Sequence, residues 1–276
     1  MGLIDELWRY DGRRAVVTGC ASGIGAQVVE QLTELGAHVV GLDRQAPSAE
    51  IAEFHCVDLS DAESIDRGVA SVGGQVDALF NVAGVSSGIG DPLLVVMVNF
   101  LGLRHLTESL VQKMPAGSAI VSVSSLAAKG YRENRRVTGG LLQTATMSDG
   151  IGWCTRNPDA LADGGYRLSK EAIILYTMSK TTALGGRGIR INCTGPGVTE
   201  TPILDQLRSA YGQRFLDDIH KPLGRVSDPG EQAAALVFLN SRAASYISGQ
   251  VLWVDGGNTG AAFARELEEG QAQWPA

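Results

Sequence analysis

Short apolar segments alternate with longer amphipathic segments along most of this 276-residue chain. Strands that are apolar on both faces and alternate with helices are typical of a parallel sheet covered by helices on both sides. The sequence therefore predicts one α/β domain over residues 1–276, with a doubly wound parallel sheet of about seven strands. The predicted strands are 15–17, 38–42, 53–57, 78–81, 119–123, 190–193 and 250–254, and the clearest predicted helices are 23–35, 95–112 and 165–184.

Two segments depart from this alternation. Residues 131–164 are Gly-rich and polar and show no clear periodicity, which predicts an insertion between two regular elements. Residues 258–276 follow the last predicted strand and form a polar tail, either helical or loose. No linker, repeat or low-complexity tract divides the chain, and this supports a single domain.

Charge and apolar content argue against several classes of protein. A net charge of −7 disfavours a nucleic-acid surface and binding to anionic membranes. The longest apolar stretch, residues 92–103, is interrupted by Asn99 and is too short to span a bilayer. The N-terminus lacks the apolar segment of a signal peptide. Four cysteines lie far apart in the sequence, and no histidines cluster near them: Cys20, Cys56, Cys154 and Cys193. This spacing predicts reduced thiols in a cytoplasmic protein, and neither a disulfide framework nor a metal site.

A glycine-rich turn follows the first predicted strand and precedes the first predicted helix. Its three glycines have the spacing G-x-x-x-G-x-G. Glycines at such a turn let the backbone approach a pyrophosphate, and the helix N-terminus favours negative charge. This context predicts a Rossmann-type dinucleotide site formed by Gly19, Ala21, Ser22, Gly23, Ile24 and Gly25.

Acidic residues end the second and third predicted strands. Asp43 lies 18 residues after Gly25 (43 − 25), where a carboxylate accepts hydrogen bonds from the adenosine ribose and repels a 2′-phosphate. We therefore expect NAD as the cofactor rather than NADP, although Arg44 beside this acid offers a contact for a phosphate. Asp58 and Leu59 end the third strand, where they can meet the adenine. Asp58 can alternatively act as the N-cap of the next helix.

Tyr166 and Lys170 lie four residues apart on a predicted helix, so their side chains share one face. A free phenol has a pKa near ~10, and lowering it by ~3 units takes roughly 4 kcal/mol. A nearby cation in a poorly solvated site can supply this free energy. The pair thus predicts a phenol that exchanges protons near neutral pH. Taken alone, the same spacing fits a solvated helix face.

Several further motifs occur in a fixed order along residues 12–258, and together they resemble the single-domain short-chain dehydrogenase/reductase family. Within this family the chain is most similar to the bacterial 3α-hydroxysteroid dehydrogenase/carbonyl reductase group. Three features carry this narrower resemblance: GCASGIGA at 19–26, the long gap before Tyr166, and GPGVTETPIL at 195–204. The motifs are Thr18 to Gly25, Asn81-Val82-Ala83-Gly84, Asn99, Ser124-Ser125, Tyr166 with Lys170, and Pro196-Gly197.

The resemblance implies a four-residue active site for hydride transfer with a nicotinamide cofactor and no metal. Tyr166 is expected to act as general acid or base, with its pKa lowered by Lys170, which also binds the nicotinamide ribose. Ser125 is expected to hold the substrate oxygen, since the second serine of the pair is the catalytic one in the family. Asn99 is expected to position a water that links Lys170 to solvent, or simply to cap backbone groups.

The resemblance also implies further cofactor contacts. Residues at the ends of the central strands are expected to line the adenosine ribose and the passage to the nicotinamide, and those after the sixth strand to flank the nicotinamide. Thr199 can instead reach the pyrophosphate, and Val198 is expected to hold the carboxamide through its backbone. In addition to Tyr166 and Lys170, the expected residues are Asn81, Ala83, Gly84, Val123, Pro196, Gly197, Val198, Thr199 and Thr201.

The insertion at 131–164 makes the distance from Ser125 to Tyr166 longer than is usual in the family. One interpretation is a lid over the substrate. The other is that the insertion covers the helical surface that family members use to form tetramers, and both can hold together. The expected apolar lid contacts are Leu141, Leu142, Met147, Ile151 and Trp153.

An apolar flap is expected after Thr201. Such a flap suits a hydrophobic secondary alcohol or its ketone, such as a steroid, a monoterpenol or an aryl alcohol. The protein is expected to form a homodimer or homotetramer. Packing of a short helix against the core is the alternative. Rival functions are an NAD-retaining dehydratase or epimerase, with Glu133, Asp149 or Asp163 as the extra acid, and a catalytically silent NAD-binding protein. The flap residues are Ile203, Leu204, Leu207, Tyr211 and Phe215.

Overall fold

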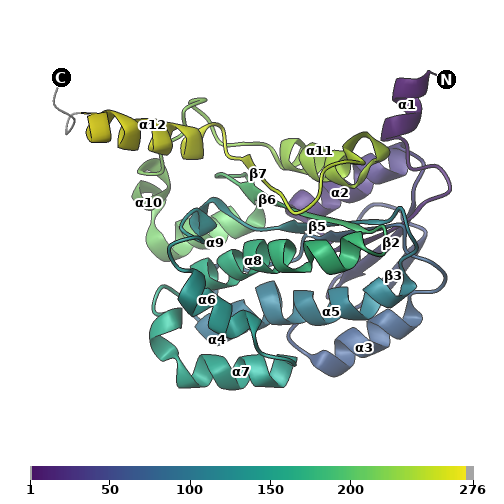
Figure 1. Ribbon diagram of the computed structural model, residues 1–276, viewed down its shortest axis with the longest axis horizontal. Coiled ribbons are helices and arrows are strands. Elements are labelled where there is room, and N and C mark those ends of the chain that lie inside the picture. Colours follow the sequence, from purple (N-terminus) through teal and green to yellow (C-terminus); the bar gives the residue numbers. More distant parts are fainter. Residues whose placement is uncertain (1, 272–276) are drawn as a thin grey trace.

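The computed structural model describes residues 2–271, and at its centre lies a seven-stranded parallel sheet with helices on both faces (Figure 1). The strand order is β3-β2-β1-β4-β5-β6-β7. All seven predicted strands are present, which confirms the doubly wound fold. The strands are β1 (Arg14–Thr18), β2 (His38–Asp43), β3 (Glu53–Cys56), β4 (Ala78–Asn81), β5 (Ala119–Val123), β6 (Arg190–Pro196) and β7 (Val251–Val254).

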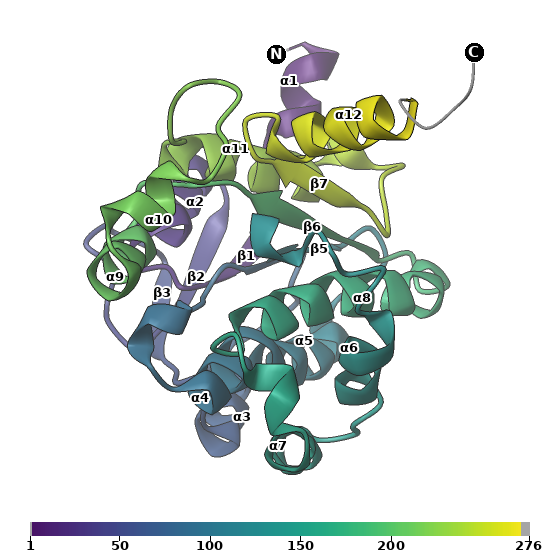
Figure 2. The ribbon, with the colours of Figure 1, turned by 90° about the vertical axis from the view of Figure 1, so that its left-hand side faces the viewer.

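Helices cover both faces of the sheet. In Figure 2, α2 and α11 lie on one side of the strands, and α3, α5 and α8 lie on the other. The α-helices are α1 (Leu3–Trp8), α2 (Gly23–Glu34), α3 (Ala62–Ser71), α4 (Pro92–Val96), α5 (Leu103–Leu110), α6 (Arg135–Leu142), α7 (Met147–Arg156), α8 (Tyr166–Gly185), α9 (Pro202–Tyr211), α10 (Gln213–Asp217), α11 (Pro229–Asn240) and α12 (Asn258–Gln271). Short 3₁₀ turns are η1 (Ser87–Ile89), η3 (Val111–Lys113), η4 (Leu126–Ala128), η5 (Pro158–Leu161) and η6 (Arg242–Ala244), and η2 (Met97–Gly102) is π-helical.

The strand order reverses at β1, which lies between β2 and β4. Thr18 at the end of β1 is in register with Leu42 of β2 and with Asn81 of β4. In doubly wound sheets, ligands bind outside the carboxyl ends of the strands at such a switch point. The register therefore brings the glycine-rich turn, the end of β2 and the end of β4 to one edge of the sheet.

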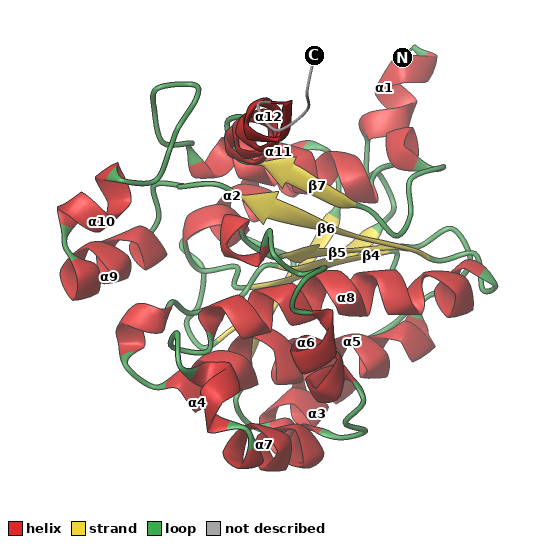
Figure 3. Cartoon of the chain, turned by 60° about the vertical axis from the view of Figure 1, so that its left-hand side comes forward, coloured by secondary structure: helices red, strands yellow, loops and turns green. Residues whose placement is uncertain are grey.

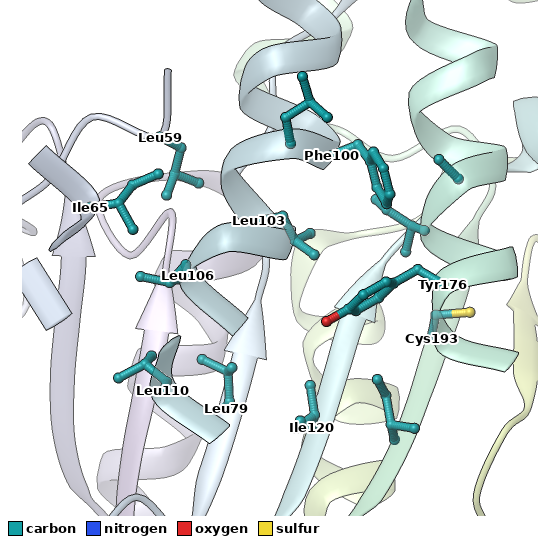
Figure 4. Packing of buried hydrophobic residues seen from close by; sticks show 14 of the residues in the cluster. Leu59, Ile65, Leu79, Phe100, Leu103, Leu106, Leu110, Ile120, Tyr176 and Cys193 are labelled. Atoms are coloured by element: carbon teal, nitrogen blue, oxygen red, sulfur yellow. The ribbon is translucent and has the colours of Figure 1, made fainter. Parts of the chain in front are cut away.

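Two apolar cores hold the layers together. The larger one fills the face covered by α3, α5 and α8, where Phe100 and Tyr176 pack edge to face with 6.1 Å between ring centres (Figure 4). The smaller one lies under α2 and α11, and the hydroxyl of buried Tyr10 donates to the Val237 carbonyl at 2.7 Å. Packing of this kind makes the sheet a rigid base for the loops at its carboxyl edge.

The helix predicted at 95–112 is longer than expected. It runs without a break from Pro92 to Lys113 and is long and apolar enough to cross a membrane by length and composition alone. However, 67% of its most apolar window is buried inside the protein. Its apolar residues are therefore explained by packing against the sheet. Its central turn, Met97–Gly102, is π-helical and carries Asn99.

The insertion is more ordered than its sequence pattern predicted. It forms α6, α7 and η5, which lie outside α5 and α8 (Figures 2 and 3). Several glycines serve close packing here, and they interrupt the apolar repeat that would have revealed the helices. A Cβ on Gly150 would lie 2.4 Å from a methyl group of Leu101, and one on Gly140 would lie 2.9 Å from Trp153 Nε1.

The expected lid residues belong to the core. Leu141 and Met147 are buried in the larger core, and Leu142, Ile151 and Trp153 pack against it. Two buried charged side chains fasten the insertion. Arg104 of α5 donates to the carbonyl oxygens of Thr144 and Thr146, and Glu171 of α8 accepts from Asn134 and Thr138. These contacts hold the insertion against α5 and α8, and its roles as a lid and as a cover for an assembly surface both stay predictions.

The tail after β7 begins with α12, which extends to Gln271. The predicted tail therefore starts as a helix, and its residues 272–276 lie outside the described part of the chain.

Candidate active site

The glycine-rich turn depends on the conformational freedom and small size of its glycines. Gly19 and Gly23 have φ angles of +72° and +55°, a backbone conformation that side chains disfavour. A Cβ on Gly19 would lie 2.7 Å from the Ala83 Cα, and one on Gly25 would lie 1.9 Å from the Gly19 carbonyl oxygen. The N-cap Ser22 makes no side-chain capping hydrogen bond. The first N–H groups of α2 thus remain available for an anion, which fits a pyrophosphate.

Asp43 lies directly beside this turn. Its Oδ2 accepts a hydrogen bond from the Ala21 N–H at 3.0 Å, and its Oδ1 accepts from the Gln45 N–H at 3.1 Å. The carboxylate therefore fixes the turn as well as standing where a ribose is expected. Arg44 is exposed at the end of the same strand. Both candidates for discriminating NAD from NADP are thus present at this edge.

Asp58 is a second acid at the adenosine end. Its Oδ1 accepts from the N–H and hydroxyl of Ser60, at 2.8 and 2.6 Å. Burial alone would raise the pKa of Asp58, but these hydrogen bonds and the charge of Arg44 lower it. The alternative that Asp58 caps the next helix is wrong, because Asp61 is the N-cap of α3. Leu59 is buried.

The end of β4 is tied to the end of β1. Thr18 Oγ1 accepts from the N–H groups of Val82 and Ala83, at 3.0 and 3.1 Å. Asn81 is buried, and its amide donates to Thr107 Oγ1 at 2.9 Å. Its side chain therefore holds β4 to α5. Among the other candidates, Ile24 packs against the smaller core.

Tyr166 is the first residue of α8, and two glycines fix its position. Gly164 and Gly165 have φ angles of +82° and +72°. A Cβ on Gly165 would lie 2.4 Å from the Pro92 carbonyl oxygen, so this turn fits closely against the start of α4. Burial raises the pKa of the Tyr166 phenol, and a hydrogen bond with the Ser125 side chain opposes that rise. The phenol and the serine hydroxyl therefore share one site.

Lys170 lies one turn further along α8. Its Nζ is 5.6 Å from the centre of the Tyr166 ring and donates to the Val123 carbonyl oxygen at 2.9 Å. Burial lowers the pKa of Lys170 to about 8. The expected lowering of the Tyr166 pKa by Lys170 is not evident in this structure, where burial is the dominant influence, and it stays a prediction for the complex with the dinucleotide.

The paired serines have different surroundings. Ser124 is buried, and its hydroxyl donates to the Lys170 carbonyl oxygen at 2.7 Å. Ser125 is the N-cap of η4, where its Oγ accepts from the Ala127 N–H at 3.1 Å. Because Oγ accepts in that bond, its proton is available to a substrate oxygen.

Asn99 is close to Lys170 but has its side chain engaged. Its Oδ1 accepts from the Val85 N–H at 2.8 Å, and its Nδ2 donates to the Val85 carbonyl at 2.9 Å and to Ser169 Oγ at 3.2 Å. A Cβ on Gly84 would lie 3.2 Å from Asn99 Oδ1 and 3.4 Å from Lys170 Nζ. Backbone capping is therefore what the side chain does here, and the water relay stays a prediction.

The segment after β6 forms the other wall of the site. Val198 accepts from the Ser227 N–H through its carbonyl at 2.9 Å, whereas its own N–H has no acceptor within residues 2–271. That free donor fits the expected contact with a carboxamide. Thr199 Oγ1 lies 2.8 Å from Ser227 Oγ, and this contact directs it toward α11. Pro196 and Gly197 connect β6 to this segment.

The predicted flap corresponds to α9 and α10. A Cβ on Gly23 would lie 3.3 Å from Thr201 Cγ2, so the start of α9 faces the glycine-rich turn. Ser86 donates to Gln206 Oε1 at 2.9 Å and joins α9 to the loop after β4. Leu204 is buried, whereas Tyr211 and Phe215 are 47% and 46% exposed, with ring centres 5.2 Å apart. Packing thus accounts for one predicted flap residue and leaves these two rings at the surface.

Comparison with known proteins agrees with this geometry. Residues 13–137 match the family described as short chain dehydrogenase, and residues 159–259 match the family described as enoyl-(acyl carrier protein) reductase. The chain is 36% identical to coniferyl-alcohol dehydrogenase of a Pseudomonas species, over 89% of this chain and 96% of that protein. It is 29% identical to 3α-hydroxysteroid dehydrogenase/carbonyl reductase of Comamonas testosteroni, over 88% of this chain and 95% of that protein.

A solved structure shows the same likeness. The 3α-hydroxysteroid dehydrogenase of a Pseudomonas species, solved in complex with NADH, superposes with a TM-score of 0.79 at 33% identity and covers 91% of this chain and 99% of that chain. The predicted resemblance to the hydroxysteroid dehydrogenase group is therefore confirmed. Sequence similarity across nearly the whole chain, together with the same seven-stranded fold, shows that the protein belongs to the short-chain dehydrogenase/reductase family.

Proposed function

We propose that this protein is an NAD-dependent alcohol dehydrogenase that interconverts a hydrophobic alcohol and its carbonyl compound. One observation carries the proposal: Ser125, Tyr166 and Lys170 meet at the carboxyl edge of the sheet, beside a turn shaped for a pyrophosphate. The relatives named for coniferyl alcohol and for hydroxysteroids support an alcohol as substrate. Coniferyl alcohol is a primary alcohol, so the proposed substrate class includes primary as well as secondary alcohols.

The choice of NAD rests on Asp43. A carboxylate beside the glycine-rich turn accepts hydrogen bonds from two ribose hydroxyls and repels a phosphate in the same place. The similar hydroxysteroid dehydrogenase was solved with NADH, which supports the same choice. When bound, the nicotinamide supplies the acceptor or donor of a hydride, and the protein itself has to manage only the proton.

The side chains present can manage that proton. Ser125 donates a hydrogen bond to the substrate oxygen and holds it next to the Tyr166 phenol. During alcohol oxidation Tyr166 takes the hydroxyl proton, and during carbonyl reduction it returns one. The buried ammonium of Lys170 stabilises the phenolate that forms in between, because opposite charges interact strongly where water is excluded.

The rival dehydratase or epimerase lacks support from the position of its candidate acids. Asp149 completes the capping box of α7 by accepting from the N–H and hydroxyl of the N-cap Thr146, and Asp163 pairs with Arg167 at 2.6 Å. Glu133 is exposed. Two of these acids are therefore engaged in other contacts within the insertion, and the third is exposed.

A panel of alcohols tests the proposal directly. Steroid, monoterpene and aryl alcohols are incubated with the protein and NAD, and NADH is followed by its absorbance. We expect NADH from at least one hydrophobic alcohol, and a smaller rate with NADP. No reduction of either dinucleotide by any alcohol, and no oxidation of NADH by the matching aldehydes and ketones, would contradict the proposal.

A further inference from the structure

The segment 202–217, which forms α9 and α10, is anchored by few buried side chains. It lies beyond the carboxyl ends of the strands and is joined to the body of the protein by loops (Figure 3). Leu204 and Leu216 are the buried residues of this segment, all of which the structure describes. A segment with so few buried apolar contacts opens at a small cost in free energy. Each further contact that holds it closed therefore has a measurable effect.

The start of α9 lies against the glycine-rich turn. A Cβ on Gly23 would lie 3.3 Å from Thr201 Cγ2 and 3.6 Å from Pro202 Cδ. The residues just before α9 are tied to the body of the protein, because Thr199 and Ser227 form a β-bridge. The helix therefore begins at a fixed point, beside the turn expected to bind a pyrophosphate.

Further along, α9 meets η1, the short turn in the loop after β4. Ser86 is buried, and its Oγ accepts from the Gly88 N–H at 3.2 Å and donates to Gln206 Oε1 at 2.9 Å. A Cβ on Gly88 would lie 2.8 Å from the Gln206 carbonyl oxygen, so the two backbones also touch. Gln206 is exposed, so water can replace the serine hydroxyl when α9 moves away. Ser86, Gly88 and Gln206 thus form a latch between η1 and α9.

The side of the latch that η1 forms is held firmly. Asn99 Oδ1 accepts from the Val85 N–H at 2.8 Å, and Asn99 Nδ2 donates to the Val85 carbonyl at 2.9 Å. A Cβ on Gly164 would lie 2.7 Å from Ser87 Cβ, so η1 also fits closely against the turn that precedes Tyr166. Opening of the latch therefore moves α9 and leaves η1 in place.

The two contacts of α9 lie on both sides of the expected dinucleotide site. Gly23 belongs to the turn after β1, and Ser86 follows closely after the end of β4, the strand that pairs with β1. The ends of these strands are adjacent, since a Cβ on Gly19 would lie 2.7 Å from the Ala83 Cα. A dinucleotide bound at this switch point would lie between α9 and the strand ends. The latch would then close the protein around it.

We infer that the latch controls exchange of the dinucleotide: NAD and NADH enter and leave when the hydrogen bond between Ser86 and Gln206 breaks and α9 moves away from η1. This rests on the proposed function, because it takes the dinucleotide to bind at the glycine-rich turn. The latch consists of the protein's own groups and needs no contact with the dinucleotide. It therefore slows binding and release by the same factor and contributes little to affinity.

Stopped-flow fluorescence of NADH tests the inference through the rate constants of association and dissociation, kon and koff. Ser86→Ala removes the donor of the latch, and Gln206→Leu removes its acceptor at similar size. We expect each variant to raise both kon and koff about fivefold, which corresponds to ~1 kcal/mol for one hydrogen bond, and to leave Kd nearly unchanged. The double variant should be no faster than either single variant, because both remove the same bond.

Gly88→Ala tests the backbone contact of the latch. The φ of Gly88 lies outside the left-handed region, so the backbone itself accepts alanine, and the main obstacle to the new Cβ is the Gln206 carbonyl. We expect both rate constants to increase more than in Ser86→Ala. The control is Ser209→Ala, at an exposed serine of α9 that makes no side-chain hydrogen bond within residues 2–271, and it should leave both rate constants unchanged.

Exchange of NADH needs no alcohol, so its outcome is separate from the proposed activity. Rate constants that increase as expected support the latch even if no alcohol is oxidised, in which case only the proposed activity is wrong. Unchanged rate constants in both Ser86→Ala and Gln206→Leu overturn the inference. An increase in koff alone, with weaker binding, also overturns it, because this would show that the altered side chain contacts the dinucleotide itself.

Discussion

The ammonium nitrogen of Lys170 lies 5.6 Å from the centre of the Tyr166 ring, one turn along the same helix. Burial acts on the two groups in opposite directions, since it raises the pKa of the phenol and lowers that of the ammonium to about 8. Each group is thereby kept closer to its neutral form. Forming a phenolate here requires the positive charge of Lys170, and several consequences can be measured.

Lys170 is expected to cost the protein stability at neutral pH. Its pKa is about 8 in the folded state and ~10.4 when unfolded, so the unfolded chain binds more protons between these values. Stability should therefore increase as the pH rises from 8 toward 10.5. Without cofactor at pH 7, replacing Lys170 by Met removes the cost of the buried ammonium, which should increase the free energy of unfolding by up to about 3 kcal/mol. The Val123 carbonyl loses its donor in this variant, which should reduce the gain by ~1 kcal/mol.

Urea unfolding at pH 7 and pH 10 checks this prediction. The gain from Lys170→Met should shrink or vanish at the higher pH, and Lys129→Met, which changes an exposed lysine, should have little effect at either pH. An equal effect of Lys170→Met at both values would contradict the lowered pKa.

The two adjacent serines should separate catalysis from stability. Ser125→Ala removes a donor to the substrate oxygen, so kcat should fall by about 10²- to 10³-fold, with a stability loss no larger than the ~1 kcal/mol expected for its N-cap hydrogen bond. Ser124→Ala removes the buried hydrogen bond to the Lys170 carbonyl and should cost ~1 kcal/mol of stability, with a smaller loss of kcat. Steady-state kinetics and thermal unfolding of both variants measure the contrast. The reverse pattern would assign the catalytic role to Ser124.

Asp43 should control the choice of dinucleotide. Asp43→Asn keeps an oxygen that can accept from the Ala21 N–H but removes the charge, so kcat/KM for NADP should increase at least about tenfold. Asp43→Ala also releases the glycine-rich turn and should weaken both dinucleotides. Adding Arg44→Ala to Asp43→Asn should remove part of the gain with NADP. An unchanged NADP/NAD ratio in Asp43→Asn would reject the assignment.

Glu171 should hold the insertion to the body of the protein. Glu171→Ala leaves Asn134 and Thr138 without this acceptor, while Arg167 keeps Asp163, and it should cost about 1 to 3 kcal/mol because buried donors lose their partner. Hydrogen exchange should accelerate first in α6, where the contact is lost. Glu63→Ala, at a side chain that is 87% exposed, serves as the control and should change stability by less than ~0.5 kcal/mol. Unchanged exchange in α6 would show that other contacts hold the insertion.

The sheet and the proposed catalytic residues were predictable because local signals determine them. Asp43, Ser125, Tyr166 and Lys170 each lie at the end of a strand or the start of a helix, and a parallel sheet brings these ends to one edge. Strands apolar on both faces, such as β4 and β5, can occupy only the buried centre of such a sheet.

Long-range packing accounts for what the sequence did not predict. The helices of the insertion were missed because Gly140 and Gly150 interrupt the apolar repeat, and their purpose is visible only once Trp153 and Leu101 lie against them. Gln232 was missed for the same reason. A glutamine in a helix usually faces solvent, and only the fold shows that this one is buried.

The central claim is that the Tyr166 phenol carries the proton during alcohol oxidation with NAD. Tyr166→Phe removes only the hydroxyl, and the measurement is the rate of NADH formation from the best alcohol of the panel, made alongside calorimetric titration with NAD. We expect the rate to fall by at least about 100-fold while NAD binds nearly as tightly as to the wild-type protein. Turnover close to the wild-type rate would contradict the claim.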